Sequence, residues 1–197
     1  MTDALRMVRK AFTVGVVVTT IAWSIGLAAF IVPLTAHAAT LTAGDLIKAS
    51  LPAVYYYGAD NKRYVFPNEK TYKTWYADFS TVKTITDAEL AAGGIGGNAT
   101  YRPAQRMVKI QTDPKVYAVG KGGTLRWVKT EAAASALYGA TWNTQVDDVP
   151  DAFFTNYTVG ADVNAVADFD KAAEAASATT INQDKGLSSA PAGVGTG

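Results

Sequence analysis

The fold is decided by residues 54–66, which read Val54-Tyr55-Tyr56-Tyr57-Gly58-Ala59-Asp60-Asn61-Lys62-Arg63-Tyr64-Val65-Phe66. Two runs rich in β-branched and aromatic residues flank a Gly-Ala-Asp-Asn sequence. Gly, Asp and Asn tolerate the backbone conformations of tight turns, so this stretch predicts a β-hairpin. Residues 115–128 have the same organisation around Gly120-Lys121-Gly122-Gly123 and predict a second hairpin.

The similarity between the hairpins continues along the chain, from residues 54–96 to residues 116–160. At an offset of 62 and then of 64, identical residues recur in both stretches. The matches are Val54/Val116, Tyr55/Tyr117, Gly58/Gly120, Glu69/Glu131, Tyr76/Tyr138, Val82/Val146, Asp87/Asp151, Ala88/Ala152 and Gly96/Gly160. A duplicated unit of this size is typical of a packing or binding scaffold, because each copy covers a hydrophobic face of its neighbour.

Each predicted hairpin leads into a short helix. Asn68 and Thr130 are good N-cap residues, and a glutamate follows each of them in the first turn, where the helix dipole favours a carboxylate. Apolar residues then recur at helical spacing. The pattern predicts helices over Glu69–Tyr76 and Glu131–Tyr138, each with one buried face.

The rest of each copy predicts short elements. Extended segments are expected at Val82–Ile85 and Val146–Val149, each followed by one helical turn, while residues 98–113 indicate either another hairpin or one strand from each copy. The sequence therefore predicts an α+β fold in which two tandem β-hairpin–helix repeats pack in one small domain. Three parts are expected: a signal peptide or membrane anchor at 1–38, the duplicated domain at 39–162 with copies 53–97 and 115–161, and an Ala-rich helix with a flexible tail at 163–197.

The N-terminal 38 residues have the features of an export signal. Three basic residues precede an uncharged apolar run over residues 11–34, and Ala36-His37-Ala38 matches a cleavage pattern. The run is also long enough to span a bilayer, so the alternative is an uncleaved anchor helix. Both interpretations predict an extracytoplasmic protein, secreted or at the cell surface, which contacts the membrane only through residues 11–34 if the anchor is retained.

Removal of the leader restricts the available chemistry. The leader holds three of the 18 Lys and Arg residues and one of the 17 Asp and Glu residues, so the remainder has a net charge of −1. This charge disfavours nucleic-acid binding. The only histidine is His37, and the chain has no cysteine. The mature chain would therefore lack disulfides, Ser-His-Asp and Cys-His catalytic sites, and His or Cys ligands for metals, and no cofactor is expected.

The aromatic pattern resembles a known module. It is similar to a tandem aromatic β-hairpin/helix repeat found in exported surface proteins of candidate-phylum (Patescibacteria-like) bacteria. The resemblance covers about residues 50–162 and rests on residues 54–58, 62–67, 115–119, 125–128 and 137–139, with Glu131 and Trp142. It implies surface location and repeat architecture, but no activity and no ligand residue. One departure is Ala104, which follows Pro103 where the module would have glycine.

Four residues are candidates for ligand binding. Tyr56, Tyr64 and Trp127 offer amphipathic rings suited to sugar faces, and Arg126 lies beside Trp127 in the predicted returning strand. Arg63 has the same relation to Tyr64. The competing interpretation, which the residue types favour, is that such rings form the core and cross-strand pairs of a small fold without disulfides.

Acidic residues give weaker signals. Asp147, Asp148, Asp151 and Asp87 offer hard oxygen ligands for calcium, or a carboxylate pair for glycoside hydrolysis. No calcium-loop spacing is present, and Asp87 and Asp151 lie where a helix start favours a carboxylate. Capping is the better explanation for these two.

These observations favour a non-enzymatic function. The leading hypothesis is an exported repeat module of the cell envelope or surface, which binds a cell-wall polymer or a surface protein. The first alternative is a carbohydrate-binding module that uses exposed Tyr and Trp residues. The second is a hydrolase that depends on Asp and Glu alone.

Overall fold

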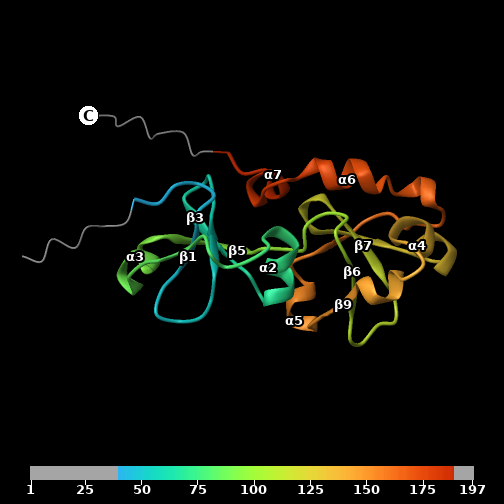
Figure 1. The fold of residues 1–197 in the computed structure, drawn as a ribbon, viewed down its shortest axis with the longest axis horizontal. Coiled ribbons are helices and arrows are strands. Elements are labelled where there is room, and N and C mark those ends of the chain that lie inside the picture. Colours follow the sequence, from blue (N-terminus) through green and yellow to red (C-terminus); the bar gives the residue numbers. More distant parts are fainter. Residues whose placement is uncertain (1–39, 189–197) are drawn as a thin grey trace, which may run out of the picture. The chain divides into compact units, whose positions relative to one another are not determined.

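The computed structural model describes residues 40–188, which form an α+β fold with two five-stranded mixed sheets and several short helices (Figure 1). The predicted α+β class is thereby confirmed. The predicted signal or anchor at residues 1–38 and the end of the predicted tail, residues 189–197, lie outside the described residues. Within residues 40–188, no helix is long and apolar enough to cross a membrane.

The first sheet has the strand order β4-β1-β2-β3-β5. Strands β2 and β3 form the predicted antiparallel hairpin, with Tyr56 opposite Tyr64, whereas β1–β4 and β3–β5 are parallel pairs. The strands are β1 (Leu46–Lys48), β2 (Tyr55–Tyr57), β3 (Lys62–Val65), β4 (Val82–Thr84) and β5 (Gly94–Asn98).

The second sheet has the order β9-β6-β7-β8-β10, with parallel and antiparallel pairs at the same places as in the first sheet. Strands β7 and β8 form the second predicted hairpin, in which Tyr117 is opposite Trp127. The strands are β6 (Met107–Ile110), β7 (Tyr117–Gly120), β8 (Thr124–Trp127), β9 (Val146–Val149) and β10 (Thr158–Val159).

Short helices follow the hairpins at the predicted places. Helices α2 (Glu69–Trp75) and α4 (Glu131–Tyr138) start at Asn68 and Thr130, whose side chains accept the predicted capping hydrogen bonds. Helix α3 (Asp87–Ala92) starts with a capping box between Thr86 and Glu89, while helix α5 (Asp151–Phe154) starts after Pro150. The capping side chains of Asn68, Thr130, Thr86 and Glu89 satisfy amide groups that have no partner within the helix.

Three buried clusters make up the core. In the first sheet, Leu46, Tyr56 and Tyr64 share one face and pack with Tyr72 of helix α2. The second sheet is covered on both faces. One cluster lies against helix α4 and contains Met107, Ala118, Val128, Leu137 and Phe169. The other contains Tyr101, Val108, Tyr117, Leu125 and Val149, with Phe153 and Phe154 packed against it.

The two matching glycines, Gly96 and Gly160, each allow a close approach between strands. A Cβ atom at Gly96 would collide with the ring of Tyr64, and one at Gly160 would come within 2.6 Å of the Thr124 methyl group. The glycine at this position leaves room for a side chain of the neighbouring strand, which gives a physical reason for its recurrence.

The segment between the sheets is not a hairpin. Strands β5 and β6 belong to different sheets, so the prediction of a hairpin over residues 98–113 is wrong. Its alternative, one strand from each copy, is met only in part, because β6 lies within this segment whereas β5 ends at Asn98. Ala104 has a φ of 59°. Glycine adopts this left-handed conformation without strain, and glycine is the residue expected at this position from the resemblance.

The chain after residue 162 packs onto both sheets. It contains a short helical turn, η3 (Val166–Asp168), and helices α6 (Lys171–Ser177) and α7 (Ile181–Lys185). The Asn182 side chain accepts a hydrogen bond from the Ala59 amide at 2.9 Å, and Asp184 accepts one from the Gly122 amide at 2.7 Å. Helix α7 thus contacts the turns of both hairpins, and the packed unit continues to Leu187.

A candidate binding groove along helix α2

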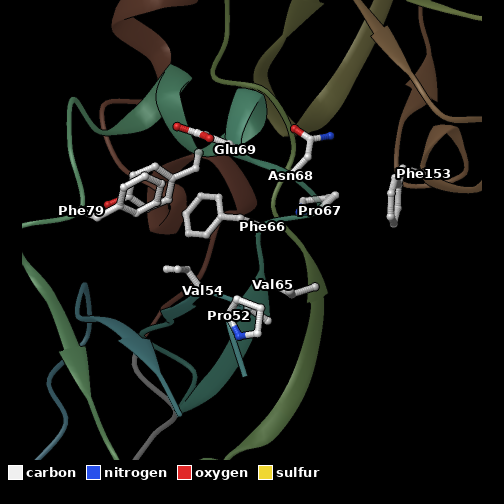
Figure 2. A pocket seen from close by; sticks show the side chains of 11 residues that line it. Pro52, Val54, Val65, Phe66, Pro67, Asn68, Glu69, Phe79 and Phe153 are labelled. Carbon is white, nitrogen blue, oxygen red and sulfur yellow. The ribbon is translucent and has the colours of Figure 1, made fainter. Parts of the chain in front are cut away.

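Two hollows adjoin at Glu69, at the start of helix α2, and we call them together the α2 groove. The first, the apolar hollow, has a volume of about 550 Å³. Figure 2 shows Phe79 and Phe153 on opposite sides of it, with Phe66 between them. The other residues that line it are Pro52, Ala53, Val54, Val65, Pro67, Asn68, Glu69 and Tyr72.

Aromatic packing fixes the apolar hollow. The ring of Phe79 stacks on Tyr72 with a centroid distance of 4.3 Å, and Phe66 meets Tyr72 edge-on at 5.0 Å. The Tyr72 hydroxyl donates to the Asp78 carbonyl at 2.7 Å, which holds the loop that carries Phe79. Phe79 nevertheless remains 43% exposed. The hollow therefore presents a ring that is held in place but open to a ligand.

The second, the charged hollow, has a volume of about 600 Å³. Three cationic and two anionic side chains line it, together with Thr74 and Gln105. The cations are Lys70, Lys73 and Arg106, and the anions are Glu69 and Asp147. Lys73 also lies 5.0 Å from the ring centroid of Phe79, so one ammonium group connects the charged hollow to the apolar one.

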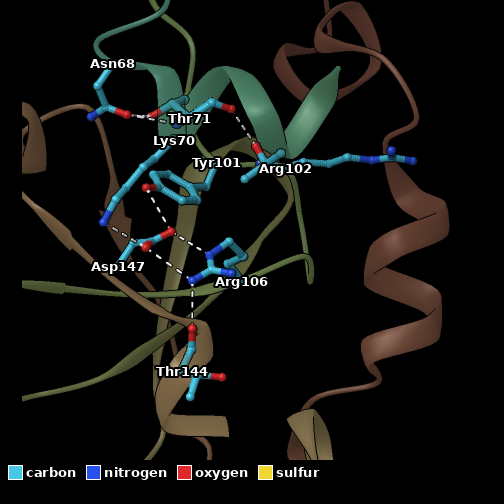
Figure 3. Close-up of polar contacts among 9 residues, drawn as sticks. Asn68, Lys70, Thr71, Tyr101, Arg102, Arg106, Thr144 and Asp147 are labelled. Carbon is cyan, nitrogen blue, oxygen red and sulfur yellow. Dashed lines mark hydrogen bonds and ion pairs between the residues drawn. The ribbon is translucent and has the colours of Figure 1, made fainter. Parts of the chain in front are cut away.

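Asp147 organises the charged hollow (Figure 3). One carboxylate oxygen accepts from Arg106 Nε at 2.5 Å and from the Tyr101 hydroxyl at 3.3 Å. The other oxygen lies 3.2 Å from Arg106 Nη2 and 3.1 Å from Lys70 Nζ. Arg106 also donates to the Thr144 carbonyl at 3.0 Å. The Asp147 side chain is only 7% exposed, and these donors satisfy its carboxylate.

The pKa of Asp147 reflects two opposing effects. Burial alone would raise this pKa, but hydrogen bonds and charge from Arg106 and Lys70 outweigh burial and lower it. Burial raises the pKa of Tyr101, so its hydroxyl keeps its proton and donates. Asp147 is consequently an anion at neutral pH, committed to the cations around it.

The same network joins the two halves of the structure. Lys70 comes from helix α2 beside the first sheet, whereas Asp147 comes from β9 of the second sheet. Two hydrogen bonds nearby have the same effect. The Trp75 indole donates to the Thr100 carbonyl at 2.8 Å, and the Arg102 amide donates to the Thr74 hydroxyl at 3.0 Å. The groove therefore depends on how the two halves pack.

The four residues predicted from sequence lie outside the α2 groove. Tyr56 is 2% exposed and Tyr64 is 5% exposed, so both rings belong to the core and present no face to a ligand. Arg126 donates to the carbonyls of Ala161 and Asp168 and is half-buried. Trp127 is half-buried on the second sheet, between two lysines, and is the one of these three rings that a ligand can reach.

The acidic residues considered for calcium have other partners. Asp148 pairs with Lys109 at 2.8 Å, Asp151 accepts from the Thr112 hydroxyl, and Asp87 accepts from the amide and hydroxyl of Ser50. Over residues 40–188, no three acidic or histidine side chains are grouped as metal ligands would be.

Sequence reasoning missed most of the groove. No sequence pattern singled out Phe79, Lys70, Lys73 or Arg106 as binding residues. Their common environment arises from contacts between residues up to 77 positions apart. No local pattern could therefore have placed them together.

Comparisons of the chain with protein-family models, with curated proteins and with solved structures found no match. The resemblance to the surface repeat module therefore stays a prediction.

Proposed function

We propose that this chain is an exported, non-enzymatic binding module of the cell envelope, and that its α2 groove holds an anionic wall polysaccharide. The observation that carries the proposal is the adjacency of the two hollows. One presents aromatic rings and prolines, and the other presents three cationic and two anionic side chains. Of the cations, Lys70 and Arg106 pair with Asp147, whereas Lys73 donates to a backbone carbonyl.

The chemistry of such a groove fits acidic sugars. The C–H faces of a sugar ring pack against aromatic rings, and a carboxylate or phosphate on the same sugar pairs with Lys or Arg. Phe79 and Lys73 supply both contacts within 5.0 Å of each other. The Lys73 side chain is exposed, and its ammonium group donates to the Ala77 carbonyl at 2.6 Å. A ligand anion therefore meets a cation that is already positioned.

The sequence supports location in the envelope. A basic segment, an apolar run and a small-x-small site precede the described fold, which is the pattern of an exported protein. The two sheets have equal strand orders and equal pairing patterns. With the residue matches at offsets of 62 and 64, this equality supports our inference that the domain consists of two tandem copies.

The state of Asp147 supports a binding role over hydrolysis. An acidic hydrolase needs one carboxyl group that keeps its proton and donates it to the leaving group. The pKa of Asp147 is lowered, and its two oxygens accept from Arg106, Lys70 and Tyr101. This carboxylate holds the groove together and has no proton to donate.

The test uses oligogalacturonate and its methyl ester, which has the same ring without the charge. The wild-type chain should bind the acid form, should lose most of that affinity as salt increases, and should bind the ester much more weakly. Lys73→Gln and Phe79→Ala should each weaken binding about 5-fold, which corresponds to a loss of about 1 kcal/mol.

Matched variants control for the loss of a positive charge and for non-specific hydrophobic binding. Lys62→Gln removes an exposed cation on the first hairpin, and Ile95→Ala removes an apolar side chain that is 74% exposed. Neither residue lines the groove, so both variants should bind as the wild type does. Equal binding of the acid and the ester, or equal losses in the groove and control variants, would contradict the proposal.

A further inference from the structure

The second copy has a hollow where the first copy has its apolar hollow. We call it the Trp142 hollow; its volume is about 180 Å³. Its lining residues match those of the apolar hollow position by position. The clearest pairs are Pro52/Pro114, Val54/Val116, Glu69/Glu131 and Phe79/Trp142. A cavity that recurs at one place in two similar sheets, with an aromatic ring in its lining each time, is a property of the repeated unit.

Charged groups of both signs surround the Trp142 hollow, and Glu131 is among its lining residues. Lys129 lines it, and the ammonium groups of Lys115 and Lys129 lie 5.0 and 5.1 Å from the ring centroid of Trp127. Lys115 pairs with Asp113 at 3.7 Å and Lys129 with Asp162 at 2.7 Å, and both lysine side chains are more than a third exposed. Exposed pairs of this kind contribute about 0–1 kcal/mol, so the carboxylate of a ligand can replace either aspartate.

We infer that the Trp142 hollow is a second subsite for the same class of anionic polysaccharide. The inference rests on the proposed function of the α2 groove. Trp142 supplies the ring that Phe79 supplies in the first copy, and Lys129 supplies the cation that Lys73 supplies there. The smaller volume limits the subsite to a shorter segment of the polymer. A polymer that occupies both places binds with the effective concentration of a linked ligand and dissociates more slowly than a short oligomer.

Calorimetry with a digalacturonate measures the number of sites. The wild-type chain should bind two molecules of this oligomer. Lys129→Gln and Trp142→Ala should each weaken one of the two sites about 5-fold, which corresponds to a loss of about 1 kcal/mol, and Lys73→Gln should weaken the other site to the same extent. Lys129 is exposed, so Lys129→Gln reports on the subsite even if Trp142→Ala disturbs the fold. Lys109→Gln is the matched control, because Lys109 lines neither hollow and pairs with Asp148.

Long polygalacturonate gives a second measure. Loss of either site should weaken binding of the polymer about 10-fold or more, whereas Lys109→Gln should leave it unchanged. One bound digalacturonate per wild-type chain, with no effect of Lys129→Gln and Trp142→Ala, would overturn the second subsite and leave the α2 groove intact. No binding of either ligand would overturn the proposed function and the subsite together.

Discussion

Replacement of Asp147 by asparagine should destabilise the fold strongly, because this carboxylate links the two halves. The Asp147 side chain is 7% exposed and the Arg106 side chain is 34% exposed, so their pair lies between the surface and buried cases. Exposed pairs contribute about 0–1 kcal/mol, and loss of one partner of a buried pair costs about 3–5 kcal/mol. We therefore expect Asp147→Asn to lower the free energy of unfolding by about 3 kcal/mol and Tm by roughly 6–12 °C.

Double-mutant cycles divide this loss between the partners. The Arg106–Asp147 cycle, with Arg106→Met, should give a coupling energy of about 2 kcal/mol. The Lys70–Asp147 cycle, with Lys70→Met, should give about 0.5 kcal/mol, because the Lys70 side chain is 64% exposed. Urea denaturation followed by tryptophan fluorescence measures all the variants at neutral pH.

The pH dependence has a defined sign. The pKa of Asp147 is lower in the folded state than in the unfolded chain, so its stabilisation is present above the unfolded pKa of about 3.9 and is lost as pH falls through the folded pKa. Asp147→Asn should remove this part of the acid sensitivity. The reasoning is refuted if Asp147→Asn costs less than about 1 kcal/mol, or if the Lys70 coupling equals that of Arg106.

Three further predictions concern stability. Burial raises the pKa of Asp184, although the hydrogen bond from Gly122 opposes this shift. The stabilisation of the fold by Asp184 is therefore present below the unfolded pKa of about 3.9 and is lost as pH rises through the folded pKa. Asp184→Asn should raise Tm at neutral pH and have little effect in acid, which thermal melts at both pH values measure. Gly96→Ala should cost about 1–3 kcal/mol in urea because its methyl group meets the Tyr64 ring, whereas Gly94→Ala, with only an ordinary contact, should be nearly neutral. Thr86→Ala should cost about 1 kcal/mol by loss of the capping box, against no change for the exposed control Thr84→Ala.

Local chemistry explains what the sequence predicted well. The hairpins depend on turn residues such as Asn61, which has a φ of 61°, and the helix starts depend on caps such as Asn68 and Thr130. These interactions connect residues within a few positions. They are therefore visible in a short window of sequence.

Tertiary packing explains what the sequence did not predict. Strand alternation predicts that Tyr56 lies on the opposite face of the sheet from Tyr55 and Tyr57. Helices α2 and α7 determine which face is buried, and they cover the face that carries Tyr56 and Tyr64. The charged hollow likewise exists only because helix α2 meets β9. Within the predicted Ala-rich region, helix α6 starts only at Lys171, because Phe169 is extended and buried in the cluster against helix α4.

The most direct test of the central claim is an NMR titration of the exported chain with oligogalacturonate, in which amide shifts report the contact surface. The account predicts saturable shifts at Lys70, Lys73 and Phe79 in the α2 groove, with no shifts at the same concentration of the methyl ester. Shifts that are absent from helix α2, or that are equal for the charged and the neutral ligand, would contradict it.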